Sequence, residues 1–188
     1  MMNRREALSR VAIIMGGTVI GSEAFLTGCK ASTKTVSFSK DDIAFLNEVA
    51  ETILPATNTP GAKEAKVGEF MTVMVNDCYE EDNQIIFMEG MKALKFKDAK
   101  AKIGKSFMEA SAEERHQFLV TLDAEAKEYQ KNKKAEEPTH YFSMIKQLTL
   151  TGFFTSEVGA TKVLRYVATP GRFDGSAPYI KGEKAWAT

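Results

Sequence analysis

The sequence predicts an all-α protein: a single domain of about five helices, followed by an irregular C-terminal tail that is rich in glycine and aromatic residues. Three observations predict this class. Apolar residues recur at helical spacing in several stretches, and strand-like alternation never lasts beyond a few residues. Sequences typical of capping boxes precede two of these stretches. The length of 188 residues suits one domain.

The first helix is predicted to begin after Ser39, because Asp42 stands where an acidic side chain completes a capping box. Pro55 ends this helix, and the turn-rich loop PATNTPGA follows it. The inward positions are Ile43, Leu46, Val49, Ala50, Ile53 and Leu54.

Two further helices are predicted after this loop. The second runs from Val67 to Cys78, and Cys78 is expected to be a small buried side chain. The third lies between Asn83 and Ala101. Their inward positions are Val67, Phe70, Met71, Met74, Val75 and Cys78, then Ile86, Phe87, Met91 and Leu94.

The fourth helix begins at a second capping box, Ser111 with Glu114, and ends in the basic run 131–134. Pro138 is predicted to be the first residue of the fifth helix, and Gly152 is predicted to cap its C-terminus. The inward positions are Phe118, Leu119, Leu122, Ala126 and Tyr129, then Tyr141, Phe142, Ile145, Leu148 and Thr149. The tail is expected to wrap the helical body, with one short helix near residues 156–164.

Residues 1–28 are predicted to be a twin-arginine signal peptide. Arg4 and Arg5 form a basic segment, Leu8 stands at the apolar place that such signals have, and the apolar run 11–21 is too short to span a membrane. This export route carries folded proteins. The alternative is an ordinary amphipathic first helix in a cytosolic protein.

The signal ends in Leu-Thr-Gly-Cys, which is typical of a bacterial lipobox. The Cys29 thiol would receive a lipid and become the first residue of the mature chain. Residues 29–38 are then a tether and residues 39–188 the helical domain. The predicted location is the cell envelope, with the protein facing the periplasm and held by its lipid.

Composition and motifs exclude several kinds of chemistry. The 25 basic and 25 acidic residues cancel, which argues against nucleic-acid binding. The sequence has no Cys-x-x-Cys-His for a c-type haem and no Gly-x-Gly-x-x-Gly for a flavin, and we predict no cofactor, metal or catalytic residue in this chain. His116 is expected on the surface and His140 at a helix start. The pairs Glu113-Glu114 and Glu136-Glu137 are interpreted as capping charge.

Two blocks carry a family resemblance. Residues 44–62 end in ETILPATNTPGA, and residues 151–175 begin TGFFTSEVG and end PGRFDG. Both blocks resemble the gluconate 2-dehydrogenase subunit 3 family. The resemblance implies the small subunit of a membrane-associated sugar or polyol dehydrogenase, whose large subunit is a glucose-methanol-choline flavoprotein that carries FAD. A cytochrome c subunit commonly takes the electrons. The chain itself would be a non-catalytic export escort and stabilising partner.

The loop and the tail are the expected partner interface, because Tyr and Trp anchor interfaces well. The alternative is that these aromatics close the protein's own core. Arg165 and Arg172 would pair with partner carboxylates or lie solvated. The interface candidates are Pro60, Gly61, Phe153, Phe154, Thr155, Ser156, Glu157, Tyr166, Arg172, Phe173 and Trp186.

Two other functions remain open from the sequence. The first is a solitary lipid-anchored helical module that recognises another envelope protein. The second is an independent enzyme that uses His116, His140 or the carboxylate pairs.

Changing Arg4 and Arg5 to Lys is expected to hold the chain, and any partner exported with it, in the cytoplasm, because the twin-arginine pathway recognises the arginine pair. Cell fractionation followed by immunoblotting measures this. Export at the parental level would contradict the signal assignment.

Overall fold

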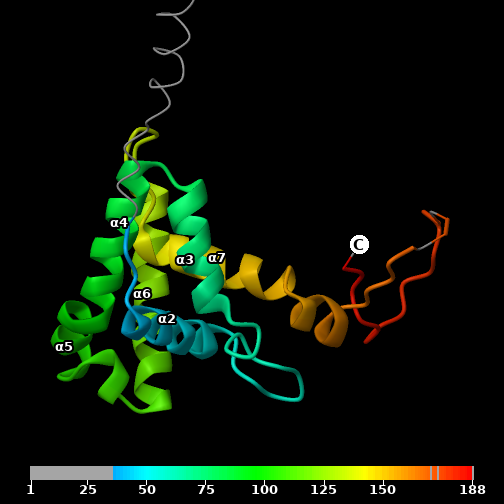
Figure 1. Ribbon diagram of the computed structural model, residues 1–188, viewed down its shortest axis with the longest axis horizontal. Helices are drawn as coiled ribbons and strands as arrows, with labels where there is room; N and C mark the ends of the chain where they lie inside the picture. Colours follow the sequence, from blue (N-terminus) through cyan, green and yellow to red (C-terminus); the bar gives the residue numbers. More distant parts are fainter. Residues whose placement is uncertain (1–35, 170, 173, 188) are drawn as a thin grey trace, which may run out of the picture. The chain divides into compact units, whose positions relative to one another are not determined.

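The first described helix begins where its capping box predicts. The computed structural model describes residues 36–169, 171–172 and 174–187 (Figure 1). Helix α2 (Lys40–Ile53) starts after Ser39, whose hydroxyl accepts the Asp42 amide at 3.2 Å while the Asp42 carboxylate accepts the Ser39 amide at 3.2 Å. It ends before Pro55, which cannot continue a helix.

The other regular elements in the described part of the chain are also helical, which confirms the all-α prediction. Six α-helices and no strand occur in the described part of the chain, where one isolated bridge joins Arg165 and Trp186. After α2 come α3 (Val67–Cys78), α4 (Glu81–Lys92), the π-helical turn η1 (Ala93–Lys97), α5 (Asp98–Ile103), the 3-10 turn η2 (Phe107–Glu109), α6 (Ala112–Asn132), α7 (Tyr141–Phe154) and the π-helical turn η3 (Gly159–Val163).

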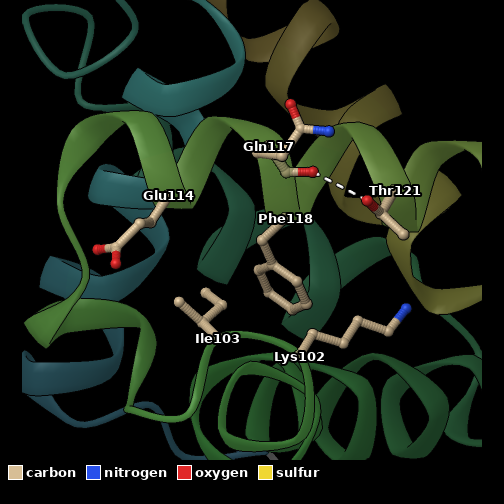
Figure 2. A pocket seen from close by; sticks show the side chains of 6 residues that line it. All are labelled: Lys102, Ile103, Glu114, Gln117, Phe118 and Thr121. Atoms are coloured by element: carbon tan, nitrogen blue, oxygen red, sulfur yellow. Dashed lines mark hydrogen bonds between the residues drawn. The ribbon is translucent and has the colours of Figure 1, made fainter.

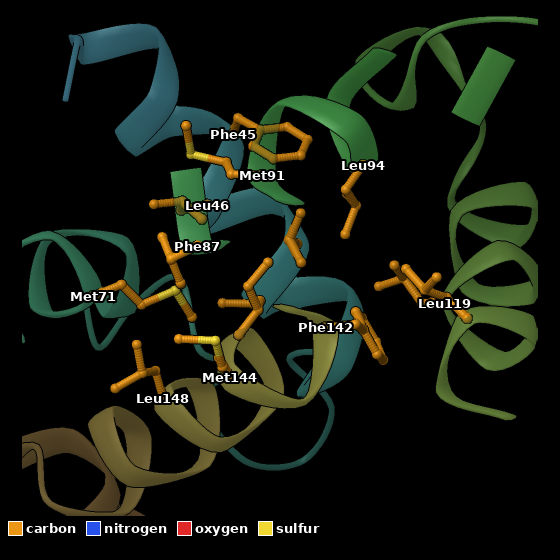
Figure 3. Packing of buried hydrophobic residues seen from close by; sticks show 14 of the residues in the cluster. Phe45, Leu46, Met71, Phe87, Met91, Leu94, Leu119, Phe142, Met144 and Leu148 are labelled. Carbon is orange, nitrogen blue, oxygen red and sulfur yellow. The ribbon is translucent and has the colours of Figure 1, made fainter. Parts of the chain in front are cut away.

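The core lies where α2 packs against α3, α6 and α7 (Figure 3). Phe45 and Leu46 from α2 are fully buried there. The predicted inward set omitted Phe45, although its ring packs edge-on against Phe107 with centroids 5.5 Å apart. Phe38, which precedes α2, packs its ring against Phe87 of α4 with centroids 6.2 Å apart. The described domain therefore begins its packing before the first helix.

The predicted third helix is divided by a π-helical turn. Leu94 and Ala99 are both buried although they lie five residues apart, because η1 inserts one extra residue into the helical register. The same turn leaves Phe96 on the outside. Gly104, with φ of +83°, ends α5.

Three sequence predictions about α3 and α7 are wrong. Cys78 is exposed, because the buried side of α3 stops at Val75. Pro138 does not begin α7. The helix begins at Tyr141, since the His140 Nδ1 accepts the Phe142 amide at 3.2 Å and His140 is therefore the N-cap. This confirms His140 as a helix-start residue.

The third correction concerns Gly152, which is not a C-cap but lies inside α7. A Cβ at this position would stand 2.5 Å from Cδ1 of Phe70 on α3. The missing side chain thus lets α7 approach α3 closely. Thr155 is the C-cap instead.

The capping boxes predict a loss of stability in acid. At the start of α6 the hydrogen bond from Lys105 and those from Ser111 lower the pKa of Glu114 from 4.5 to about 2. A folded-state pKa below the unfolded value means that this stabilisation is complete above about pH 4.5 and is lost as the pH falls towards 2. Urea unfolding at pH 6 and pH 3, followed by circular dichroism, measures the change.

Glu114→Gln is the control, because its amide keeps an acceptor but cannot titrate. This variant should lose less stability between the two pH values than the parent. An equal loss in both proteins would contradict the assigned role of Glu114.

Candidate partner-binding surface

One carboxylate holds the loop between α2 and α3. The amides of Ala56 and Lys63 donate to the two oxygens of Glu51, each at 2.8 Å. Gly61 closes over this carboxylate so tightly that a Cβ there would overlap both oxygens and stand 2.6 Å from the Ala56 nitrogen. The Glu-Thr-Ile-Leu-Pro to Pro-Gly-Ala block therefore encodes a loop that wraps a half-buried carboxylate.

A second carboxylate ties this loop to α6. Glu48 forms ion pairs with Lys63 and with Arg115, the latter at 3.1 Å. The Arg115 guanidinium also donates to the carbonyls of Phe107 and Met108 at 3.0 and 2.7 Å. The Glu48, Lys63 and Arg115 side chains and the two η2 carbonyls thus belong to one network. This network spans α2, the loop, η2 and α6.

The Thr-Ser-Glu-x-Gly block forms the junction between α7 and η3. The Ser156 hydroxyl donates to the Phe153 carbonyl at 2.6 Å and accepts the Gly159 amide at 3.0 Å. A Cβ on Gly159 would collide with the same carbonyl. Glycine is required because the backbone turns back directly onto the end of α7.

The fold brings the second block beside the α2–α3 loop, which contains the end of the first block. Lys162 in η3 forms an ion pair with Glu64 of the α2–α3 loop at 2.7 Å. Val163 packs against the core beside it. Residues almost a hundred positions apart in the sequence therefore form one continuous surface.

The tail closes on itself. The Arg165 amide donates to the Ala185 carbonyl at 2.8 Å, and the Ala187 amide donates to the Arg165 carbonyl at 3.0 Å. The Arg165 guanidinium lies over the Trp186 ring, 4.1 Å from its centroid, and pairs with Glu183. The described tail (orange to red in Figure 1) is nearly all exposed, so the expectation that it wraps the helical body is wrong.

The predicted interface residues divide by burial. Gly61 and Phe153 are buried and serve the protein's own packing, whereas Pro60 and Ser156 are half-buried. Phe173 and the signal residues Arg4, Arg5, Leu8 and Cys29 lie outside the described residues. The exposed candidates are Phe154, Thr155, Glu157, Tyr166, Arg172 and Trp186.

The exposed apolar surface extends beyond these candidates. Tyr179 is 88% exposed and Ile180 is 59% exposed, both within the loop that Arg165 and Trp186 close. Sequence reasoning missed Ile180, because nothing in its neighbours distinguishes an exposed isoleucine from a buried one. The interface as a whole stays a prediction.

The histidines have separate environments. Burial lowers the pKa of His140, which keeps its ring neutral and able to cap α7. His116 is exposed, as predicted, at a cleft of about 400 Å³ that the carboxylates of Glu48, Glu51 and Glu113 also line. The Glu48 and Glu51 carboxylates are engaged by the protein's own donors.

Another concavity lies between α5 and α6 and has a volume of about 460 Å³ (Figure 2). Two of its charged side chains are committed elsewhere, since Glu114 closes a capping box and Lys102 pairs with Glu125.

Among the described residues no group of three His, Cys, Asp or Glu side chains is placed to hold a metal ion. No described helix has the length and apolarity needed to cross a membrane.

Gly61→Ala is expected to destabilise the domain by about 1–3 kcal/mol, because the new methyl group displaces the Glu51 carboxylate and leaves two amides without their acceptor. Urea unfolding measures this. Thr59→Ala is the matched control in the same loop, where the side chain is exposed, and it should change stability by less than about 0.5 kcal/mol. Equal midpoints for the two variants would contradict the role of Gly61.

A comparison with protein families supports the resemblance that the two sequence blocks indicated. No curated protein and no solved structure gave a significant match. The family described as gluconate 2-dehydrogenase subunit 3 matches residues 40–171, which include α2 to α7, η3 and the start of the tail loop. The chain therefore belongs to the gluconate 2-dehydrogenase subunit 3 family.

Proposed function

We propose that this chain is the non-catalytic small subunit of a flavin-dependent sugar or polyol dehydrogenase complex, in which it escorts and stabilises the large subunit that carries FAD. The observation that carries this proposal is the family match over residues 40–171. A protein of this family is a subunit, so it acts in contact with other chains.

The contact surface we assign is the tail loop together with the end of α7. Phe154, Tyr166 and Trp186 are 39%, 49% and 53% exposed there. Aromatic side chains of this kind bury a large area on binding and lose few torsions. Arg165 closes the loop through backbone hydrogen bonds, an ion pair and its stacking on Trp186, which reduces the ordering cost of binding.

The proposal assigns the redox chemistry to other subunits. FAD belongs to a large subunit of the glucose-methanol-choline type, and a c-type cytochrome subunit receives its electrons. Three polar side chains of the described domain have structural tasks: Glu51 holds a loop, Glu48 joins α2 to α6, and His140 caps α7.

The proposal also includes the route and the place of the complex. The arginine pair Arg4-Arg5 directs a folded complex to twin-arginine export, so a partner that has already bound FAD leaves the cytoplasm with this chain. A lipid on Cys29 then holds the complex at the envelope, facing the periplasm.

Purification of the tagged chain from native membranes tests the proposal. A large flavoprotein with yellow flavin absorption is expected to co-purify, and mass spectrometry identifies it. Tyr166→Ala with Trp186→Ala should lower its recovery more than about tenfold, since both are exposed aromatic anchors.

Val73→Ala with Val120→Ala is the matched control, because these exposed apolar side chains lie on α3 and α6, away from the tail. Recovery in this control should stay within about twofold of the parent. Isolation of the parental chain without a flavoprotein would overturn the proposal and favour a solitary lipid-anchored module.

A further inference from the structure

Lysine is concentrated in one stretch of this neutral chain. The whole chain balances 25 basic against 25 acidic residues, yet residues 92–105 contain six lysines, no arginine and a single acidic residue, Asp98. This stretch covers the end of α4, the π-helical turn η1 and α5. The described fold therefore has a local excess of positive charge.

Half of these lysines are neutralised by the protein itself. Lys95 pairs with Asp42, Lys102 with Glu125 and Lys105 with Glu114. The other three have no carboxylate at ion-pair distance among the residues that the structure describes, and all three are exposed. These three are Lys92, Lys97 and Lys100.

The π-helical turn places an aromatic ring among the unpaired lysines. Because η1 turns Leu94 and Ala99 inward together, Phe96 projects outward and is 57% exposed. Lys92, Phe96 and Lys97 line the same concavity of about 580 Å³. Glu89 also lines this concavity and is the acidic residue of its lining.

This patch lies close to the point where the chain enters the fold. Lys95 of η1 reaches Asp42 in the first turn of α2 at 3.0 Å, and Phe38 packs on Phe87 of α4. Cys29 stands nine residues before Phe38. Nine extended residues reach at most about 30 Å, so a lipid on Cys29 keeps this end of the domain near the bilayer surface.

We propose that Lys92, Phe96, Lys97 and Lys100 form a membrane-binding patch that takes anionic phospholipid head groups. The three ammonium groups pair with lipid phosphates, and the Phe96 ring enters the boundary between head groups and acyl chains. The proposal rests on the lipid anchoring included in the proposed function. It adds that the domain is held against the bilayer on a defined side.

The residue types favour a lipid surface over a protein partner. Interfaces between proteins are enriched in arginine and depleted of lysine, whereas this stretch has only lysine. The long flexible stem of lysine lets its ammonium group follow mobile head groups. Each lysine near an anionic surface contributes about fivefold in affinity, hence on the order of a hundredfold for the three.

The test uses the full chain with Cys29→Ser, which removes the proposed lipid and leaves everything else in place. Flotation with vesicles of phosphatidylglycerol and phosphatidylcholine measures partition. Changing Lys92, Lys97 and Lys100 to Gln should lower partition at least about tenfold, and Phe96→Ser should lower it further. The partition of the parent should fall as salt rises, because the charges are exposed.

Lys127, Lys131 and Lys134 changed to Gln form the charge-matched control, since these exposed lysines lie in the last turns of α6 and just beyond it. The signal segment is the same in every protein, so differences report the patch alone. The control should partition within about twofold of the parent. Equal loss in both triple variants, or no loss in either, would overturn the membrane-binding patch.

The membrane pull-down separates this inference from the proposed function. If the patch variant keeps vesicle binding but loses the flavoprotein, the patch is a protein interface and the inference is wrong. If vesicle binding depends on the patch but no flavoprotein accompanies the parental chain, the inference stands and the proposed function fails.

Discussion

The structure depends on helix α2, because its two sides hold the rest of the domain in place. One side inserts Phe45, Leu46 and two smaller side chains fully into the core against α3, α6 and α7. The other side presents two carboxylates. Glu48 binds Arg115 of α6, and Glu51 gathers the loop that leads to α3. Burial of the apolar side orients the carboxylates, and the carboxylates in turn fix the segments that complete the core.

The two blocks that identify the family owe their glycines to close backbone approach. Gly61 leaves room for the Glu51 carboxylate, and Gly159 leaves room for the carbonyl at the end of α7. Both residues act on the fold by permitting these close approaches. Their effect is to bring Glu64 and Lys162 within 2.7 Å of each other, which places the α2–α3 loop beside the start of the tail. The glycines of the family signature thus determine the surface formed by the α2–α3 loop and the start of the tail, because they fix the backbone beneath it.

Two exposed regions give the domain distinct tasks in the proposed complex. The tail loop, closed by Arg165 and Trp186, displays aromatic side chains and suits a protein partner. The lysine-rich turn η1 displays Phe96 in a concavity that Lys92 and Lys97 also line, and this region suits an anionic surface. A rigid helical domain between them would hold a redox partner at a set height above the bilayer. Neither task needs a reactive centre in this chain.

The sequence by itself determined the features that depend on neighbours along the chain. The capping boxes at Ser39 and Ser111, the stop at Pro55 and the helical class all follow from contacts within one or two turns. Tertiary packing decided the rest: the approach of Phe70 keeps Gly152 inside α7, the π-helical turn exposes Phe96, and the end of the buried side of α3 leaves Cys78 in solvent. Periodicity indicates which residues share one face of a helix. It does not indicate which other element packs against that face, or at which residue the packing ends. Those are set by contacts between residues far apart in the chain.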